Sequence, residues 1–216
     1  PIPAARQHLT FSQRQRGQVL PEDVKVDAST TPEEAEQQGK RVDVMLDLET
    51  LGKGNNAVLL SIGAVKFNPF GNVLYDSFYV PIDPESCQAV GLKMDASTVM
   101  WWMDDQRTPA RSAMMQEERL SLPEALYGFV DWFGDDKPVW GNGATFDNVI
   151  LTSALAACSI DKPWKFWNDK CYRTLKGMAP GVKLQRQGTY HNARDDAVSQ
   201  ARHMQLIVRH LRLRDL

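Results

Sequence analysis

The sequence predicts an α/β fold in which a mixed β-sheet, with three antiparallel strands followed by parallel additions, is flanked by helices. Three segments rich in Val, Leu, Ile and aromatic residues follow one another closely at 42–48, 57–67 and 73–80, and their spacing predicts antiparallel neighbours. Helical patterns then alternate with a short strand at 139–140. Strands first and helix–strand–helix alternation afterwards indicate a mixed sheet covered by helices.

The helices are predicted from their ends and from the spacing of their apolar residues. The first helical stretch after the three strands is expected at 96–103. The segment Ser121-Leu-Pro-Glu124 is a capping box, so the next helix is expected to begin directly after Ser121. Two further helices are predicted at 146–158 and 193–213. The apolar stripe of the last helix consists of Ala197, Ala201, Met204, Val208 and Leu211.

Two regions are expected along the 216 residues, a flexible tail or linker at 1–41 and one folded domain at 42–216. The first region contains only 11 apolar residues and six charges of each sign, which is too little apolar surface for a core. A short helix over 32–38 fits within this region, because Thr31 can cap it and Pro32 suits its first position.

Charge and cysteine content exclude several classes of protein. The formal net charge of −2, from 25 Lys and Arg against 27 Asp and Glu, argues against a protein that coats duplex nucleic acid by bulk charge. The three cysteines are far apart, so they predict neither a disulfide framework nor a zinc site. The sequence contains neither a signal-peptide h-region nor an apolar stretch of about 18 residues. We therefore expect a reducing, cytoplasmic location and no membrane partner.

Two carboxylates at the end of the first predicted strand are the first candidate site residues. Asp47 and Glu49 are two residues apart, so on a strand both side chains project from the same face. Adjacent negative charges at the end of an apolar strand are unfavourable unless a cation neutralises them, and an all-oxygen pair suits Mg²⁺ or Mn²⁺. A pair of this spacing also arises about once by chance in such an acidic chain. A second pair, Asp83 and Glu85, is interpreted as a solvated turn.

Three further candidates lie where helices are predicted to begin. Asp147 follows a strand and a glycine-containing turn, whose small residues allow another group to approach the backbone closely. His191 precedes the last helix, and Asp196 lies in its first turns, beside the alternative acid Asp195. Each acid could instead simply favour a helix N-terminus through its charge, and the histidine could be an ordinary surface residue.

In this order, the residues resemble the motifs of the DEDDh 3′-5′ exonucleases, the RNase T/DnaQ-like group with a ribonuclease H-like fold. The resemblance runs from residue 42 to the C-terminus and includes all three motifs of the family. The matched residues are Asp47 and Glu49 in DLET, Asp147 in FDN, and His191 and Asp196 in HNARDD. Asn192 stands where a tyrosine would mark the sister class. The segment VWGNGATFDNVIL and the Trp101-Trp102 pair resemble a bacterial and prophage subgroup of exoribonucleases and exodeoxyribonuclease VIII-like proteins.

The resemblance implies a metal-dependent hydrolase that acts at the 3′ end of single-stranded or 3′-overhang RNA or DNA. It implies two divalent cations, Mg²⁺ or Mn²⁺, held by Asp47, Glu49, Asp147 and Asp196, with Asp47 bridging them. His191 would take the proton of the attacking water. Family members of this size are often homodimers, so the resemblance also implies a second copy of the chain as a partner.

The substrate is expected to lie along a basic segment and several apolar side chains. Residues 162–194 carry eight basic residues against one acid, a net charge of +7, and lie between the second and third motifs. A basic segment of this kind can also be an ordinary solvated loop. The expected substrate-binding residues are Leu51, Trp102, Phe146, Arg173 and Arg194. Adjacent Trp101 and Trp102 point in different directions on a helix, so we expect one in the core and the other free to stack on a base.

Two other functions are compatible with parts of the pattern. A catalytically weak module of the same fold could bind nucleic acid or a protein partner, and a nuclease assay would distinguish it. A carboxylate-pair hydrolase such as a glycosidase needs neither the histidine nor a metal, so a chelator would leave it active.

Overall fold

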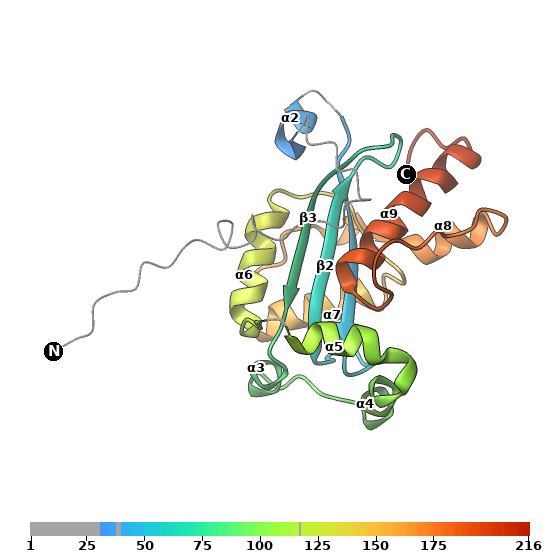
Figure 1. Ribbon diagram of the computed structural model, residues 1–216. Helices are drawn as coiled ribbons and strands as arrows, with labels where there is room; N and C mark the ends of the chain where they lie inside the picture. The colour runs from blue at the N-terminus through green and yellow to red at the C-terminus, as the bar shows by residue number, and fades with distance from the viewer. Residues whose placement is uncertain (1–30, 38–39, 117) are drawn as a thin grey trace.

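The computed structural model describes residues 31–37, 40–116 and 118–216 of the chain (Figure 1). Most of the region expected to form a tail, 1–30 and 38–39, lies outside the described residues. The predicted short helix is present as α2 (Pro32–Gln37) and begins with a capping arrangement between Thr31 and Glu34. Its Ala35 is fully buried in an apolar cluster with Val42 and Tyr75, so this part of the expected tail packs against the domain.

The five strands form one mixed sheet in the order β3-β2-β1-β4-β5. Their bounds are β1 (Asp43–Thr50), β2 (Leu59–Phe67), β3 (Leu74–Pro81), β4 (Val139–Gly141) and β5 (Asp169–Cys171). The first three strands are antiparallel neighbours, and β4 and β5 add in parallel beside β1. The predicted fold class, three antiparallel strands with parallel additions, is therefore confirmed.

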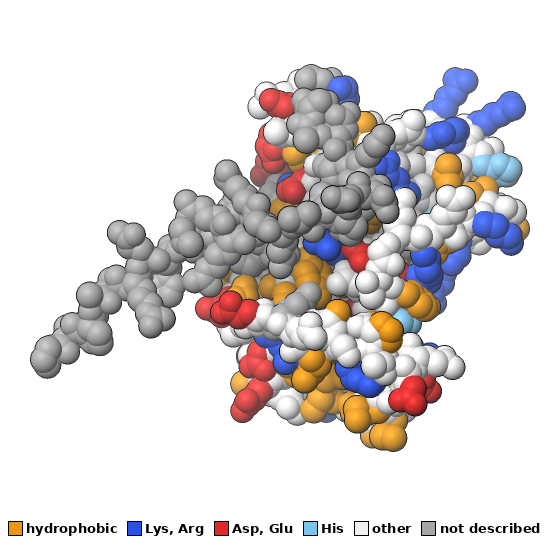
Figure 2. All heavy atoms as spheres, viewed as in Figure 1, with side chains coloured by type: hydrophobic (Ala, Val, Ile, Leu, Met, Phe, Trp, Pro, Cys, Tyr) orange, Lys and Arg blue, Asp and Glu red, His pale blue; other side chains and the backbone are white. Residues whose placement is uncertain are grey.

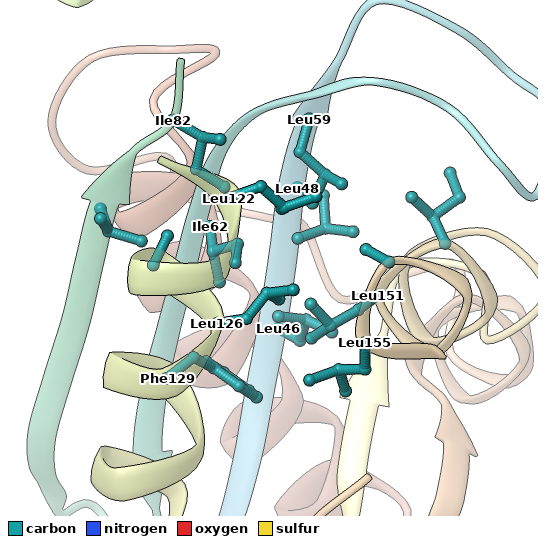
Figure 3. Packing of buried hydrophobic residues seen from close by; sticks show 14 of the residues in the cluster. Leu46, Leu48, Leu59, Ile62, Ile82, Leu122, Leu126, Phe129, Leu151 and Leu155 are labelled. Atoms are coloured by element: carbon teal, nitrogen blue, oxygen red, sulfur yellow. The ribbon is translucent and has the colours of Figure 1, made fainter. Parts of the chain in front are cut away.

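Helices cover both faces of the sheet, and strand β1 contributes to both cores because its side chains alternate. Leu46 and Leu48 face helices α6 (Leu122–Phe133) and α7 (Asp147–Ala157), and Figure 3 shows Leu126, Phe129, Leu151 and Leu155 packed around them. Met45 faces the other core, which contains residues of α8 (Tyr172–Met178) and α9 (Ala193–His210). Since the side-chain period of a strand is two, Asp47 and Glu49 share the face of Met45 and lie on the side of α9.

Several predicted helices occur where the local signals were strongest. Helix α4 (Ala96–Met103) has the predicted bounds, and Ser121 and Glu124 form the predicted capping box of α6. Helix α9 ends three residues before the predicted end. The pair Asp83 and Glu85, interpreted as a solvated turn, instead begins a helix, because the Asp83 carboxylate accepts the Glu85 and Ser86 N–H groups.

Six short elements, each of nine residues or fewer, were not predicted. Besides β5 and α8 they are α3 (Pro84–Ala89), η1 (Asp105–Arg107), α5 (Thr108–Gln116) and η2 (Phe166–Asn168). Among the helices of the described segments, none combines the length and apolarity that crossing a bilayer requires.

Candidate active site

Three separate segments bring the five predicted site residues to one cleft of about 200 Å³. The end of β1 provides two acids, the start of α7 one, and the loop before α9 with its first turn provides the histidine and the last acid. The residues that line the cleft in this way are Asp47, Glu49, Asp147, His191 and Asp196. Motifs that are far apart in the sequence thus meet at one place in the fold.

Two glycines allow the helices to approach the strands closely enough to form the cleft. A Cβ atom on Gly63 of β2 would lie 2.1 Å from the carbonyl carbon of Ala193, so the start of α9 lies directly on this strand. A Cβ atom on Gly141 of β4 would lie 2.5 Å from Asn148 Oδ1 and 3.0 Å from the Asp147 side chain. The close approach predicted for the small residues before α7 is therefore made by the first residues of α7 itself.

Three of the four carboxylates are buried and Asp47 is half-buried, and the four repel one another. Burial, and then the charges of Asp147, Glu49 and Asp196, hold the pKa of Asp47 well above its usual range. Burial and the charge of Asp196 raise the pKa of Glu49 to about 8. Burial also raises the pKa of Asp147 to about 7, although backbone N–H groups, that of Leu48 first, favour its charged form. Such a group of acids can be ionised together at neutral pH only beside added positive charge.

The donor set fits a hard divalent cation. One ligand atom from each of Glu49, His191 and Asp196 lies within 4.8 Å of the other two. Asp47 stands beside them, with Oδ1 accepting a hydrogen bond of 2.7 Å from Gln200 Nε2. Oxygen-rich sites of buried carboxylates are those that Mg²⁺ and Mn²⁺ prefer.

The imidazole of His191 is held between aromatic side chains. It stacks on Tyr190 at a centroid distance of 3.7 Å and meets Trp101 edge-to-face at 4.9 Å. The residue has a φ of 64°, and its backbone N–H donates to Asp196 Oδ2 at 3.0 Å. Burial, followed by the charges of Arg107 and Arg186, lowers the pKa of His191, which favours the neutral ring.

The two adjacent acids at the start of α9 have different contacts. Asp195 accepts the Thr189 N–H at 2.7 Å, and a Cβ atom on Gly188 would lie 2.2 Å from its carboxylate, so Asp195 holds the preceding loop. Asp196 lines the cleft and forms an ion pair with Arg186. Of the two acids that the sequence offered, Asp196 is therefore the one that faces the other carboxylates.

A second cavity of about 360 Å³ adjoins the cleft and shares Leu48, Glu49 and Phe146 with it. Trp101 and Trp102 both line it. The pair divides into one buried and one exposed ring, as expected, and Trp102, the expected substrate-binding residue, is the buried one. Trp102 is 5% exposed and donates its Nε1–H to the Thr50 carbonyl, whereas Trp101 is 37% exposed.

The other expected substrate-binding residues are not all brought together. Arg173 lines the cleft beside Gly143, whereas Arg194 lies against Tyr79 and Asp195 and lines neither cavity. Leu51 packs against two apolar clusters and also lines neither cavity. Figure 2 shows Lys and Arg side chains gathered over α8 and α9, the part of the surface to which the basic segment contributes.

Five cleft residues were not among the candidate site residues from the sequence: Leu48, Asn142, Arg186, Tyr190 and Gln200. Gln200 could have been found, because it lies four residues after Asp196 and therefore on the same face of α9. Arg186 and Tyr190 come from an irregular loop, where no periodic signal indicates which side chains turn inward.

Comparisons with known proteins agree with this architecture. The family model described as "3'-5' exoribonuclease Rv2179c-like domain" matches residues 42–208. The exodeoxyribonuclease of Enterobacteria phage T4 is 22% identical in an alignment 158 residues long that covers 61% of this chain and 69% of that protein.

Two solved structures share the fold at low sequence identity. Exonuclease I of E. coli in complex with a dT13 oligonucleotide has a TM-score of 0.59 at 14% identity, covering 81% of this chain and 42% of that one. The nuclease domain of 3'hExo, a DEDDh family member bound to rAMP, has a TM-score of 0.53 at 14% identity, covering 79% of this chain and 93% of that one. The chain thus spans about two fifths of exonuclease I and most of the 3'hExo domain. With the family match over most of its length, the chain belongs to the Rv2179c-like 3′-5′ exoribonuclease domain family, and it is a 3′-5′ exonuclease.

Proposed function

We propose that this chain removes nucleotides from the 3′ end of single-stranded or 3′-overhang nucleic acid, with Asp47, Glu49, Asp147 and Asp196 holding two divalent cations and His191 acting as the general base. The observation that carries this proposal is the convergence of four carboxylates, three of them buried and Asp47 half-buried, and one histidine in a single cleft. Divalent cations, Mg²⁺ or Mn²⁺, would activate the attacking water and stabilise the charge of the leaving oxygen.

The side chains of the cleft have separate tasks in this reaction. The Gln200 amide holds one oxygen of Asp47 and leaves the other oxygen without that contact. His191 is favoured in its neutral form and is fixed by Tyr190 and Trp101, so one ring nitrogen can accept the proton of a water in the cleft. Arg173 lines the cleft beside Gly143, where a guanidinium can contact a phosphate oxygen.

The terminal nucleotide is proposed to enter through the adjoining cavity. Trp101 and Phe146 offer aromatic surface there, and every base can stack on such a surface irrespective of sequence. The structural neighbours include exonuclease I with dA16 or dT13 and 3'hExo with rAMP, so both sugars occur at related folds. The family is described by ribonuclease activity and the phage relative by deoxyribonuclease activity. We therefore propose the 3′ end itself, rather than one sugar, as the common feature of the substrate.

Two further expectations remain proposals of the same kind. The homodimer follows from the resemblance to the family, and sedimentation at several protein concentrations would test it. The cytoplasmic location is proposed because Cys87, Cys158 and Cys171 are all free thiols, which suits a reducing compartment.

The direct test uses matched RNA and DNA oligonucleotides with 3′ overhangs and a 5′ label, each with Mg²⁺ or Mn²⁺. We expect a ladder of labelled products that shortens from the 3′ end, and no reaction after the metal is chelated. His191→Ala should abolish the ladder, while Asp83→Asn, a change at the start of α3, should leave it intact. An oligonucleotide that is bound but never shortened would favour the binding module, and hydrolysis that survives the chelator would contradict the metal mechanism.

A further inference from the structure

Arg186 lies among the carboxylates of the cleft, yet no step of the proposed reaction uses it. Its guanidinium forms an ion pair with Asp196 Oδ1. The arginine side chain is 44% exposed, whereas that of Asp196 is 9% exposed. A partly exposed side chain on an irregular loop can therefore reach a buried ligand candidate, and it can also leave it.

The guanidinium of Arg186 lies over the ring of Tyr190, which in turn stacks on His191, the proposed general base. Its central carbon lies 3.8 Å from the ring centroid of Tyr190, and Tyr190 stacks on His191 with an interplanar angle of 26°. Stacking on Tyr190 gives the guanidinium a support that does not depend on Asp196. If the ion pair opens, Arg186 can stay at the cleft.

Asp196 has both of its oxygens engaged by donors of this chain. Oδ2 accepts the His191 backbone N–H, which is fixed by the loop, and Oδ1 accepts from Arg186. A divalent cation at Asp196 would stand next to the guanidinium, and these two positive charges repel. Of the two donors, the arginine side chain is the one that can move away.

We propose that Arg186 is a positioning residue with two partners: it pairs with Asp196 before the cation is bound, and it holds a phosphate of the nucleic acid once the cation has displaced it. This inference rests on the function proposed above. The planar guanidinium matches the geometry of phosphate oxygens and can bind two of them at once. Arg186 thus opposes cation binding in the empty cleft and favours substrate binding in the loaded one.

The test compares cation binding and substrate binding in the same variants. Mn²⁺ is titrated calorimetrically into the full chain without substrate, and kcat and KM are then measured with a 3′-overhang oligonucleotide. Arg186→Gln should bind Mn²⁺ about threefold to tenfold more tightly, because the competing charge is gone, while KM rises about tenfold and kcat changes little. A merely structural role would weaken cation binding and substrate binding together. Tighter Mn²⁺ binding combined with a higher KM therefore distinguishes the proposed role.

Two variants complete the design. Arg186→Lys keeps the charge but not the planar fork, so it should retain weak Mn²⁺ binding and should not restore the wild-type KM. Lys40→Gln removes a positive charge from an exposed residue just before β1, outside the basic segment 162–194, and it should leave both measurements unchanged. If the wild-type chain is active, unchanged or weaker Mn²⁺ binding in Arg186→Gln, or an unchanged KM in this variant, would overturn the inference. A wild-type chain that shortens no oligonucleotide would contradict the proposed function instead.

Discussion

Gly63 of β2 lies directly opposite Asp47 of β1, and the first turn of α9 lies across this glycine. The side chain that β2 lacks at this point would occupy the position of the Ala193 backbone. The missing side chain therefore allows the helix that carries Asp196 to reach the strand that carries Asp47 and Glu49. A residue with no functional group of its own thus determines the distance between two parts of the site.

Replacing this glycine should damage the site and the fold together. In Gly63→Ala the new Cβ would lie 2.1 Å from the Ala193 carbonyl carbon and 2.2 Å from the Arg194 nitrogen, so α9 must shift. We expect a loss of about 2–3 kcal/mol in the free energy of unfolding, measured with urea, together with a large loss of nuclease activity. The matched control is Gly177→Ala in α8, where a Cβ meets nothing within 4 Å and should stabilise slightly. Wild-type stability and activity in Gly63→Ala would contradict this account.

Removing one carboxylate from the cleft should abolish activity and stabilise the metal-free protein. Asp47→Asn keeps the shape of the side chain and an oxygen that can still accept from Gln200, but it removes one of four mutually repelling charges. One pKa unit corresponds to about 1.4 kcal/mol, so we expect a gain on the order of 1 kcal/mol in the unfolding free energy at pH 7.5 with a chelator present. Activity with Mn²⁺ should fall by more than about 100-fold, since a proposed ligand of the cation is lost.

The same substitution four residues earlier on β1 is the control. Asp43 is fully buried, and its carboxylate accepts hydrogen bonds from Arg41 and from Trp140 Nε1. Asp43→Asn should therefore destabilise the chain, by about 1–2 kcal/mol, and should leave cation binding unaffected. If both substitutions changed stability in the same direction, repulsion among the cleft carboxylates would not explain the effect at Asp47.

The elements that could be predicted from the sequence are those with strong local signals. Helix α6 was predicted from the capping box at Ser121, and β1 from its apolar residues, because capping and periodicity act over a few residues. Strand β5 has three half-buried residues, and its existence depends on pairing with β4, which no local pattern indicates. The same limit applies to α8, a short helix that packs beside α9.

The site shows the same division between local and tertiary information. The spacing of Asp47 and Glu49 predicted a shared face, and the pleat of β1 places them on it. Which of Trp101 and Trp102 is buried depends instead on a contact between two elements. The Thr50 carbonyl at the end of β1 accepts the indole N–H of Trp102 in α4. Arg186 and Tyr190 reach the cleft through an irregular loop, so their positions could be found only in three dimensions.

A buried histidine outside the cleft should make stability depend on pH. His203 is 1% exposed, and its Nε2–H donates to the Val182 carbonyl at 2.9 Å, so the neutral ring accepts the Tyr172 hydroxyl at Nδ1, 2.6 Å away. Burial, and then the charge of Lys176, lower the pKa of His203 in the folded chain, although the Val182 contact opposes this. The unfolded chain binds the proton more tightly, so this contribution to stability is present above pH 6.5 and is lost as the pH falls through the folded pKa.

Urea unfolding at pH 7.5 and pH 5.5 would measure this contribution. The carboxylates of the cleft have raised pKa values and change stability in the opposite direction, so the comparison is between wild type and His203→Gln rather than within wild type alone. The wild type should lose more stability than the variant on acidification. His210→Gln, at the exposed end of α9, should follow the wild type. An identical pH dependence in wild type and His203→Gln would show that the pKa of His203 does not differ between the folded and the unfolded chain.

The two neighbouring tryptophans of α4 should separate binding from stability. Trp101 is 37% exposed in the cavity beside the cleft, so Trp101→Ala should raise KM for a 3′-overhang oligonucleotide about fivefold or more, in line with about 1–3 kcal/mol for one base on an aromatic ring. Trp102 is 5% exposed, so Trp102→Ala should instead cost about 3 kcal/mol or more of unfolding free energy. Trp102→Phe keeps the ring and loses only the hydrogen bond to Thr50, which should cost about 1 kcal/mol. Trp101 also meets His191 edge-to-face, so Trp101→Phe, in which an aromatic ring remains, is the control for kcat. An unchanged KM in Trp101→Ala would remove this ring from the proposed path of the terminal base.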